Sequence, residues 1–476
     1  MGKSMSQSCY LTTTLPYVNA NPHIGTAFEF VTADIIVRYK KLMGDEVFFN
    51  TGVDEYGQKV YTKALEEGKD PQKYVNESAE KFRKLKEILN LSYDNFIRTT
   101  DEHHKVAAQE FWKKSFLNGD IEKKLYKAKY CAGCELEKTD SDLVDGCCSE
   151  HPLQAIQIIE EENYFFKFSK YEKKLLELYE KNPQLVIPDF RFNEIKRFVE
   201  RGLEDFSISR LKSKMPWGVP VPGDDEHVMY VWFDALVNYI SAIGWPDDEE
   251  KFNKWWPVTQ FAGKDQVRQQ AAMWQAMLFS VGLPPSKQIV IHGFITVDGA
   301  KMSKSIGNVI NPADLVAEYG TDALRYYLAR HVHPFEDCDF TMEKFKEAYN
   351  ANLANGIGNL TARIMKLAET HLDESVELSD TEIPQSIKNE FDNFEINKAV
   401  DLVWGHIGDL DKYIQETEPF SIIKKDKEKG IEIIKNIAIK LCTIGEMLNP
   451  ILPETSEKIK NAVKENKMPK PLFMRR

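Results

Sequence analysis

The sequence predicts an α/β fold built on an open parallel sheet, interrupted by an inserted domain and followed by an all-helical unit. Extended and helical patterns alternate over the first hundred residues and again from about residue 224. A stretch rich in cysteine and aromatic residues separates these two parts, and after residue 340 apolar residues recur only at helical spacing. A chain of 476 residues is also long enough for two to four structural units.

The first half of the sheet is indicated by extended segments at 9–15 and 47–50 and by helical patterns at 27–39 and 56–91. Asn21 is suited to cap the first of these helices, and Pro22 is suited to its first turn. The second half is indicated by strands at 260–262 and 288–295 around a helix at 266–280. We therefore assign residues 1–117 and 224–311 to one sheet domain.

The other parts of the chain differ from the sheet domain in composition and in the spacing of their apolar residues. Residues 118–223 hold four of the seven cysteines, a run of three glutamates and a turn-rich segment at 216–223, which indicates an inserted domain. Apolar residues at helical spacing in 357–367, 399–414 and 431–448 predict a helical domain over 343–476, joined to the sheet by a connection at 312–342.

Composition excludes several classes of protein. The chain is 42% hydrophobic and 29% charged, as expected of a folded protein with a polar surface. Its formal charge of −12 argues against a broad nucleic-acid-coated face and against DNA binding, so any nucleic-acid contact must be local. The polar start at 1–8 and the lack of an apolar run of roughly 20 residues predict neither a signal peptide nor a membrane span. We expect a cytoplasmic protein.

A first candidate motif lies between the first strand and the first helix, at 21–26. Amide groups at a helix N-terminus attract phosphate, Gly25 leaves room for a ring against the backbone, and His23 supplies a donor for a phosphoryl oxygen. Thr26 closes the motif. The alternative is an ordinary capped helix with a chance histidine.

A second candidate motif, Lys-Met-Ser-Lys-Ser at 301–305, follows the last predicted strand. Lys301 and Lys304 on such a loop can place charge on a departing pyrophosphate, although the pentapeptide alone could equally be a solvated basic turn. One motif opens the first half-sheet and the other closes the second. Both can meet at the carboxyl ends of the central strands, where open α/β sheets bind ligands.

The paired spacing Cys131-x2-Cys134 and Cys148-x2-His151 is typical of a tetrahedral zinc site. Cys147 is an alternative fourth ligand. A cluster of free buried thiols is the competing interpretation.

The two motifs, in this order, resemble the two hallmarks of the class I aminoacyl-tRNA synthetases. Five further segments are similar to the methionyl-tRNA synthetase family: LPYVNA at 15–20, TGVDE at 51–55, YVWFDA at 230–235, GKD at 263–265 and HGF at 292–294. The resemblance extends from about residue 9 to about residue 455. It implies a Rossmann-type catalytic domain, a connective insertion with a zinc knuckle at about 127–155, a stem-contact connection and a helical anticodon-binding domain.

The resemblance also implies an activity. It is the adenylation of L-methionine by ATP with Mg²⁺, followed by transfer to tRNA(Met), with a structural Zn²⁺ in the insertion. The implied ATP-binding residues are His23, Gly25, Thr26, Gly263, Asp265, His292, Gly293, Lys301 and Lys304, of which His23, Thr26, Lys301 and Lys304 are catalytic. The implied methionine-binding residues are Leu15, Tyr17, Asp54, Trp232, Tyr239 and Gln270, the implied zinc ligands are Cys131, Cys134, Cys148 and His151, and the implied anticodon-reading residues are Asn359, Arg363 and Phe420.

Each implied role has a structural alternative. Trp232 and Tyr239 could be core residues on one helical face, and the three anticodon residues could be solvated or packed. The chain also departs from the family pattern: Thr26, Tyr56 and Gln270 stand where histidines are usual, and Gln275 replaces a proline. A synthetase for another amino acid, such as cysteine, and a catalytically weak tRNA-binding paralogue are the rival interpretations. We expect a monomer.

Overall fold

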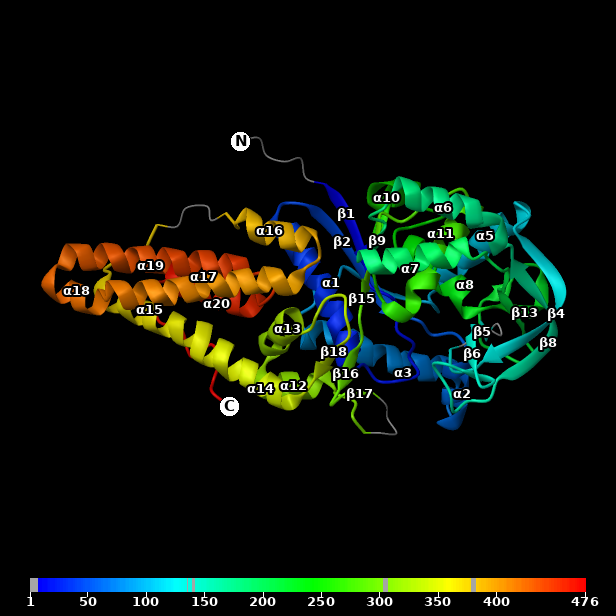
Figure 1. The fold of residues 1–476 in the computed structure, drawn as a ribbon, viewed down its shortest axis with the longest axis horizontal. Coiled ribbons are helices and arrows are strands. Elements are labelled where there is room, and N and C mark those ends of the chain that lie inside the picture. The colour runs from blue at the N-terminus through cyan, green and yellow to red at the C-terminus, as the bar shows by residue number, and fades with distance from the viewer. Residues whose placement is uncertain (1–6, 135, 139–141, 303–306, 378–381) are drawn as a thin grey trace.

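The computed structural model describes residues 7–134, 136–138, 142–302, 307–377 and 382–476. It is elongated, with a helical bundle at one end, the inserted domain at the other and a parallel sheet between them (Figure 1). Within the described residues, no helix combines the length and the apolar character needed to cross a bilayer.

The central sheet has six parallel strands in the order β3-β2-β1-β14-β15-β9. Their bounds are β1 (Ser8–Thr12), β2 (Glu46–Val53), β3 (Asn95–Arg98), β9 (Val186–Ile187), β14 (Val258–Gly263) and β15 (Gln288–His292). β1 pairs with β14, so the two sequence halves adjoin at the middle of the sheet. Every residue of β14 is buried, as a central parallel strand requires.

Helices connect the strands of the first half: α1 (Ile24–Leu42), α2 (Gln58–Glu66), α3 (Pro71–Arg83), α4 (Leu85–Ile88) and α5 (Glu102–Leu117). The predicted cap of α1 was wrong, because His23 and not Asn21 is the N-cap residue. His23 has extended backbone angles and its ring accepts from two helix amides, whereas the Asn21 side chain accepts from Lys81 Nζ at 3.0 Å.

The second half contains α8 (Val231–Ala235), α9 (Asn238–Ser241), α10 (Glu249–Trp255), a 3-10 turn η3 (Lys264–Gln266), a π-helical turn η4 (Gln269–Met273) and α11 (Trp274–Ser280). The predicted strand 288–295 is in fact two strands. β15 ends at His292, and β16 (Ile295–Val297) starts a small sheet with β17 (Ala300–Lys301) and β18 (Cys338–Phe340). Gly293 lies at this break, where a Cβ atom would come within 2.2 Å of the Glu336 carbonyl carbon.

The insertion is largely antiparallel. Its strands are β4 (Ile121–Cys131), β5 (Leu136–Lys138), β6 (Leu143–Val144), β7 (Cys147–Cys148), β8 (Gln157–Phe166), β10 (Phe206–Ser207), β11 (Ser209–Leu211), β12 (Pro220–Val221) and β13 (Asp224–Met229), and its helices are η2 (Phe168–Tyr171), α6 (Glu172–Lys181) and α7 (Asp189–Glu200). The pair β4 and β8 forms its long edge in Figure 1. The two-residue strand β9, which lies in this stretch of sequence, pairs with β15 of the central sheet.

The C-terminal region is helical: α12 (Pro312–Tyr319), α13 (Thr321–Arg330), α14 (Met342–Ala348), a π-helical segment η5 (Tyr349–Gly358), α15 (Asn359–His371), α16 (Gln385–Asp392), α17 (Ile396–Thr417), α18 (Pro419–Lys425), α19 (Lys427–Leu448) and α20 (Pro453–Lys464). One hydrophobic core runs from α1 into these helices. At the junction, the rings of Tyr39 and Phe391 stack with centroids 4.8 Å apart. The bundle is therefore packed against the sheet domain and not tethered to it loosely.

Candidate active site

A cavity of about 540 Å³ opens at the carboxyl ends of β14 and β15 and the start of α1. It lies where the two half-sheets meet, as the fold rule for open α/β sheets predicts. It is lined by every predicted ATP-binding residue that the structure describes: His23, Gly25, Thr26, Gly263, Asp265, His292, Gly293 and Lys301. Lys304, with the rest of 303–306, lies outside the described residues.

The ring of His23 is fixed in one tautomer. Its Nδ1 accepts from the backbone amides of Gly25 at 3.0 Å and Thr26 at 3.4 Å. Only an unprotonated nitrogen can accept, so the neutral ring carries its hydrogen on Nε2. Burial lowers the pKa of His23, which favours this neutral form. A Cβ atom on Gly25 would lie 2.9 Å from His23 Cε1, so glycine leaves the ring its place.

Glu29 and Thr14 also line the cavity, and the sequence analysis missed both. Glu29 Oε1 accepts from the Thr14 amide at 2.7 Å and from the Thr14 hydroxyl at 2.6 Å, while Oε2 lies 2.8 Å from His292 Nε2. Burial acts to lower the pKa of His292, but the hydrogen bond and charge of Glu29 outweigh it and the pKa is raised. Glu29 could have been found from the sequence, because it is an acidic residue among the apolar residues of α1.

Lys301 ends the short strand β17, whose partner β16 lies directly after the HGF segment. Its Nζ lies 5.9 Å from the centre of the Phe294 ring, and its side chain is exposed. The cation can therefore reach an anionic ligand in the cavity without first leaving a buried position.

Four of the predicted methionine-binding residues lie together beyond β1 and β2. The Asp54 amide donates to the Pro16 carbonyl at 3.0 Å and the Val18 amide to the Asp54 carbonyl at 3.2 Å, so the segment around Leu15 and Tyr17 runs beside Asp54. The Tyr17 and Trp232 rings meet edge to face at 6.2 Å. Burial leaves the Asp54 side chain almost inaccessible to bulk water.

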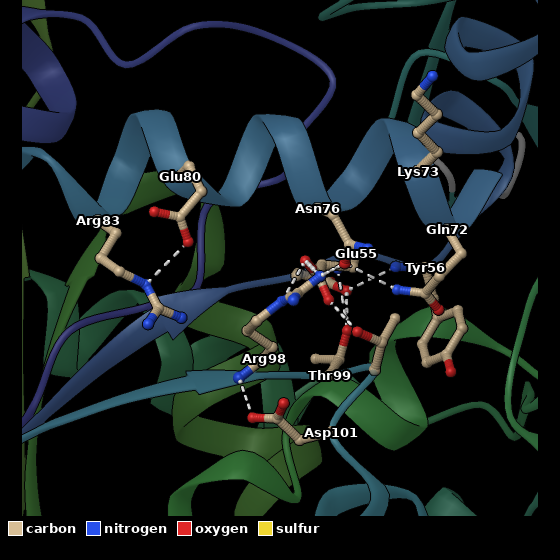
Figure 2. A network of polar contacts seen from close by, with 12 residues as sticks. Glu55, Tyr56, Gln72, Lys73, Asn76, Glu80, Arg83, Arg98, Thr99 and Asp101 are labelled. Carbon is tan, nitrogen blue, oxygen red and sulfur yellow. Dashed lines mark hydrogen bonds and ion pairs between the residues drawn. The ribbon is translucent and has the colours of Figure 1, made fainter. Parts of the chain in front are cut away.

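The segment that carries Asp54 is held by a polar network (Figure 2). Glu55 accepts from Arg98 Nε at 2.8 Å, and Arg98 also donates to Asn76 Oδ1 at 2.6 Å. The Glu55 amide donates to Thr99 Oγ1 at 2.9 Å, and that hydroxyl lies 3.4 Å from Asp54 Oδ1. Burial raises the pKa of Glu55, while the Arg98 hydrogen bond acts in the opposite direction.

Tyr239 and Gln270 form the remaining part of the predicted methionine pocket. Tyr239 is buried against the Trp274 ring, with centroids 5.9 Å apart. Burial raises the pKa of its hydroxyl, and hydrogen bonding to Gln270 opposes that shift. Gln270 in turn accepts from Gln260 Nε2 at 2.8 Å.

The predicted zinc ligands are gathered at one point of the insertion. One ligand atom from each of Cys131, Cys134, Cys148 and His151 lies within 4.8 Å of the others. Cys134 Sγ is 3.4 Å from Cys148 Sγ and 3.2 Å from His151 Nδ1. Zn–S bonds of about 2.3 Å in a tetrahedron put sulfurs roughly 3.8 Å apart, so this donor set fits a zinc ion. Cys147 is not a member of the group.

The predicted anticodon residues lie on two helices of the bundle. Asn359 and Arg363 are on α15, and Phe420 is on α18. Arg363 pairs with Asp411 at 2.7 Å, whereas the Phe420 ring is 49% exposed. Phe420 is therefore available to stack on a ligand, and Arg363 would have to share its guanidinium with Asp411.

The fold and the cavity together have the layout of an α/β enzyme with a split site shared by two half-sheets. Two segments of the chain, residues 9–157 and 152–365, match the family model described as tRNA synthetases class I (M). The chain belongs to that family.

Curated relatives and solved structures agree with this assignment. The chain is 42% identical over 469 residues to the methionine--tRNA ligase of Thermotoga maritima, covering 94% of this chain and 74% of the relative. It is 40% identical over 475 residues to the methionine--tRNA ligase of Clostridium acetobutylicum, covering 96% and 73%. Mycobacterium tuberculosis methionyl-tRNA synthetase in complex with methionyl-adenylate is 33% identical, with a TM-score of 0.90 over 98% of this chain and 99% of that chain.

Proposed function

We propose that this chain is an ATP-dependent methionine–tRNA ligase, which makes methionyl-adenylate and pyrophosphate and then transfers methionine to the 3′ end of tRNA(Met). The observation that supports this function most strongly is the cavity at the junction of the half-sheets, which is lined by His23, Thr26, His292 and Lys301. Its ligand is ATP with Mg²⁺. The relatives that cover nearly the whole chain carry the same activity in their names.

In the first step, an oxygen of the methionine carboxylate attacks the α-phosphorus of ATP, and the bond to the pyrophosphate oxygen breaks. His23 Nε2–H donates to a phosphoryl oxygen as charge builds on it, and the Thr26 hydroxyl donates a second hydrogen bond. Lys301 and Lys304 neutralise the departing pyrophosphate. Gly263, Asp265 and Gly293 hold the nucleoside.

In the second step, a hydroxyl of the terminal ribose of the tRNA attacks the methionyl carbonyl carbon, and AMP leaves. The methionine ammonium is held by Asp54 and the Leu15 carbonyl. Its thioether lies among the Tyr17, Trp232 and Tyr239 rings, since sulfur gains about 0.3–1.5 kcal/mol from each such contact. Gln270 closes the pocket.

The same proposal assigns the remaining sites. Cys131, Cys134, Cys148 and His151 hold a structural Zn²⁺ that fixes the loops of the insertion. Asn359, Arg363 and Phe420 read the anticodon, with Phe420 stacking on a base. The domains divide at 117, 229, 311 and 342, because β13 pairs with β11 and β12 of the insertion and so moves the boundary predicted at 223. The protein acts as a monomer in the cytoplasm.

The test is ATP–pyrophosphate exchange assayed with each of the twenty amino acids. The proposal predicts exchange with methionine and with no other amino acid. Exchange with cysteine would favour a different synthetase. No exchange, together with retained tRNA binding, would favour the rival interpretation of a tRNA-binding paralogue, which is suggested by Thr26, Tyr56 and Gln270.

A further inference from the structure

Five neutral polar side chains lie in a row beside the proposed methionine pocket. They are Gln260 on β14, Gln266 at the end of η3, Gln270 in η4, Gln275 on α11 and Ser286 just before β15. Gln260, Gln270, Gln275 and Ser286 are buried, and Gln266 lines the nucleotide cavity. Buried amides are costly unless they are hydrogen-bonded, so a group of this size calls for an explanation.

The five side chains form one hydrogen-bonded chain in which every donor points the same way. Gln275 Nε2 donates to Ser286 Oγ at 3.0 Å, and Ser286 Oγ donates to Gln260 Oε1 at 2.6 Å. Gln260 Nε2 donates to Gln270 Oε1 at 2.8 Å, and Gln270 Nε2 donates to Gln266 Oε1 at 3.2 Å. Reversing one amide would put two donors or two acceptors face to face.

The direction of the chain is set at its far end by the backbone. The Ser286 amide donates to Gln275 Oε1 at 2.9 Å, and Gln275 Nε2 donates to the Gln270 carbonyl at 2.9 Å. A backbone N–H can only donate and a carbonyl can only accept, so the Gln275 amide has one possible orientation. With the Gln275 amide fixed, the donor and acceptor roles of Ser286, then of Gln260 and then of Gln270 are fixed in turn.

We infer that Ser286, Gln275 and Gln260 are positioning residues for methionine binding, acting through Gln270 and Gln266. They hold the Gln270 amide with Oε1 toward Gln260 and Nε2 toward the nucleotide cavity, next to the Tyr239 hydroxyl. This inference rests on the proposed function, because it assumes that methionine occupies the pocket beside Tyr239. Because the proposed function places Gln270 against the methionine side chain and gives it no part in the transfer of the carboxylate, the chain acts on methionine affinity and not on the chemical step.

The test is steady-state ATP–pyrophosphate exchange with Ser286→Ala, which removes the hydroxyl between Gln275 and Gln260. We expect the KM for methionine to rise about tenfold, with kcat changed less than about twofold, because binding lost equally from the ground state and the transition state raises KM alone. Ser286→Thr keeps a hydroxyl and should return KM to within about twofold of the parent value. Ser280→Ala is the matched control, since Ser280 is a buried serine on the same helix as Gln275 that donates to Asp120 at 3.0 Å outside the chain.

A second variant, Gln275→Met, keeps the side-chain length and removes both polar atoms. Combined with Ser286→Ala, it should raise KM no further than either change alone, because both break the same chain. If Ser286→Ala does not fold, the KM of Gln275→Met for methionine tests the inference in its place. An unchanged KM in either folded variant, an equal rise in Ser280→Ala, or no rescue by Ser286→Thr would overturn the inference. A parent protein inactive with methionine would overturn the proposed function as well.

Discussion

His23 uses one ring nitrogen to cap α1 and leaves the other for a ligand. Both tasks depend on local geometry that the sequence encodes within four residues, from His23 to Thr26. The motif was therefore recognisable from sequence, although its cap residue was not. Asn21 has the better capping propensity, but its side chain is bound to Lys81, which is distant in sequence.

The two tasks of His23 can be separated by substitution. His23→Asn retains a capping oxygen and loses the Nε2–H donor, so we expect methionine-dependent exchange to fall about 10²–10³-fold with little change in thermal stability. His23→Ala also loses the cap and should cost about 1 kcal/mol of unfolding free energy. Exchange kinetics and denaturant titration measure the two effects. Near-parental exchange by His23→Asn would remove His23 from the catalytic site.

Residues missed from the sequence share one property. Glu29 meets His292 only after the two half-sheets have come together, and Gln260 meets Ser286 only after β14 and β15 have paired within the second half. Glu29 and His292 are separated by 263 positions. A buried acid or amide is visible in an apolar pattern, but its partner is not, because the pairing depends on tertiary structure.

At the scale of elements, α5 and α9 are joined by a buried histidine. His104 Nδ1 lies 2.9 Å from Ser241 Oγ, and burial lowers the pKa of His104 to about 4. The depressed pKa means that the unfolded chain binds more protons. This contribution to stability is therefore complete above the ordinary pKa of 6.5 and is lost as the pH falls from 6.5 toward 4.

The shift at His104 corresponds to about 3 kcal/mol of stability. We expect His104→Gln to remove that pH dependence, so that the difference in unfolding free energy between variant and parent shrinks between pH 7 and pH 4.5. Denaturant titrations at several pH values measure it. A difference that is constant with pH would show that the pKa of His104 is the same in the folded and unfolded chains.

The insertion contains the cluster of three cysteines and one histidine formed by Cys131, Cys134, Cys148 and His151. We expect about one equivalent of zinc in the purified protein, lost in Cys148→Ser and kept in Cys147→Ser. The neighbouring cysteines make a matched pair, because only Cys148 belongs to the group of four ligand atoms. Metal analysis by mass spectrometry distinguishes the two. Zinc lost from Cys147→Ser and retained in Cys148→Ser would reverse the ligand assignment.

Periodicity predicted the type of most helices and strands but not their interruptions. The helix predicted at 266–280 includes the π-helical turn Gln269–Met273, which a 3.6-residue pattern does not reveal over five residues. The strand predicted at 288–295 breaks at Gly293, where Glu336 approaches the backbone. Gly293 lines the candidate site, and the break there depends on a contact that is distant in sequence.

At the scale of the whole molecule, Arg325 on α13 ties the sheet domain to the bundle. Its guanidinium is fully buried, pairs with Asp34 of α1 at 2.8 Å and donates to the Ile451 and Pro450 carbonyls at 2.9 and 3.0 Å. Burial alone would raise the pKa of Asp34, but Arg325 and Arg38 hold it below the ordinary value. One side chain thus joins the helix that starts at His23 to the turn before α20.

Replacing Arg325 should destabilise the whole molecule. Arg325→Met leaves buried carbonyls without donors and Asp34 without one of its partners, so we expect a loss of about 3–5 kcal/mol in unfolding free energy. Arg330→Met, on the same helix, removes a partly exposed pair with Asp401 and a hydrogen bond to the Tyr326 hydroxyl, and should cost about 1 kcal/mol. Urea denaturation followed by circular dichroism compares them. Equal losses would mean that the buried junction adds nothing beyond a partly exposed ion pair.

The central claim is that the site activates methionine and that the molecule delivers it to tRNA. The most direct measurement is the fraction of a purified tRNA(Met) transcript whose 3′ end carries methionine after incubation with ATP, Mg²⁺ and the protein. We expect most of the transcript to become acylated with methionine, and none of it to be acylated when ATP or methionine is omitted. Unacylated tRNA in the complete reaction, or acylation with a different amino acid, would contradict it.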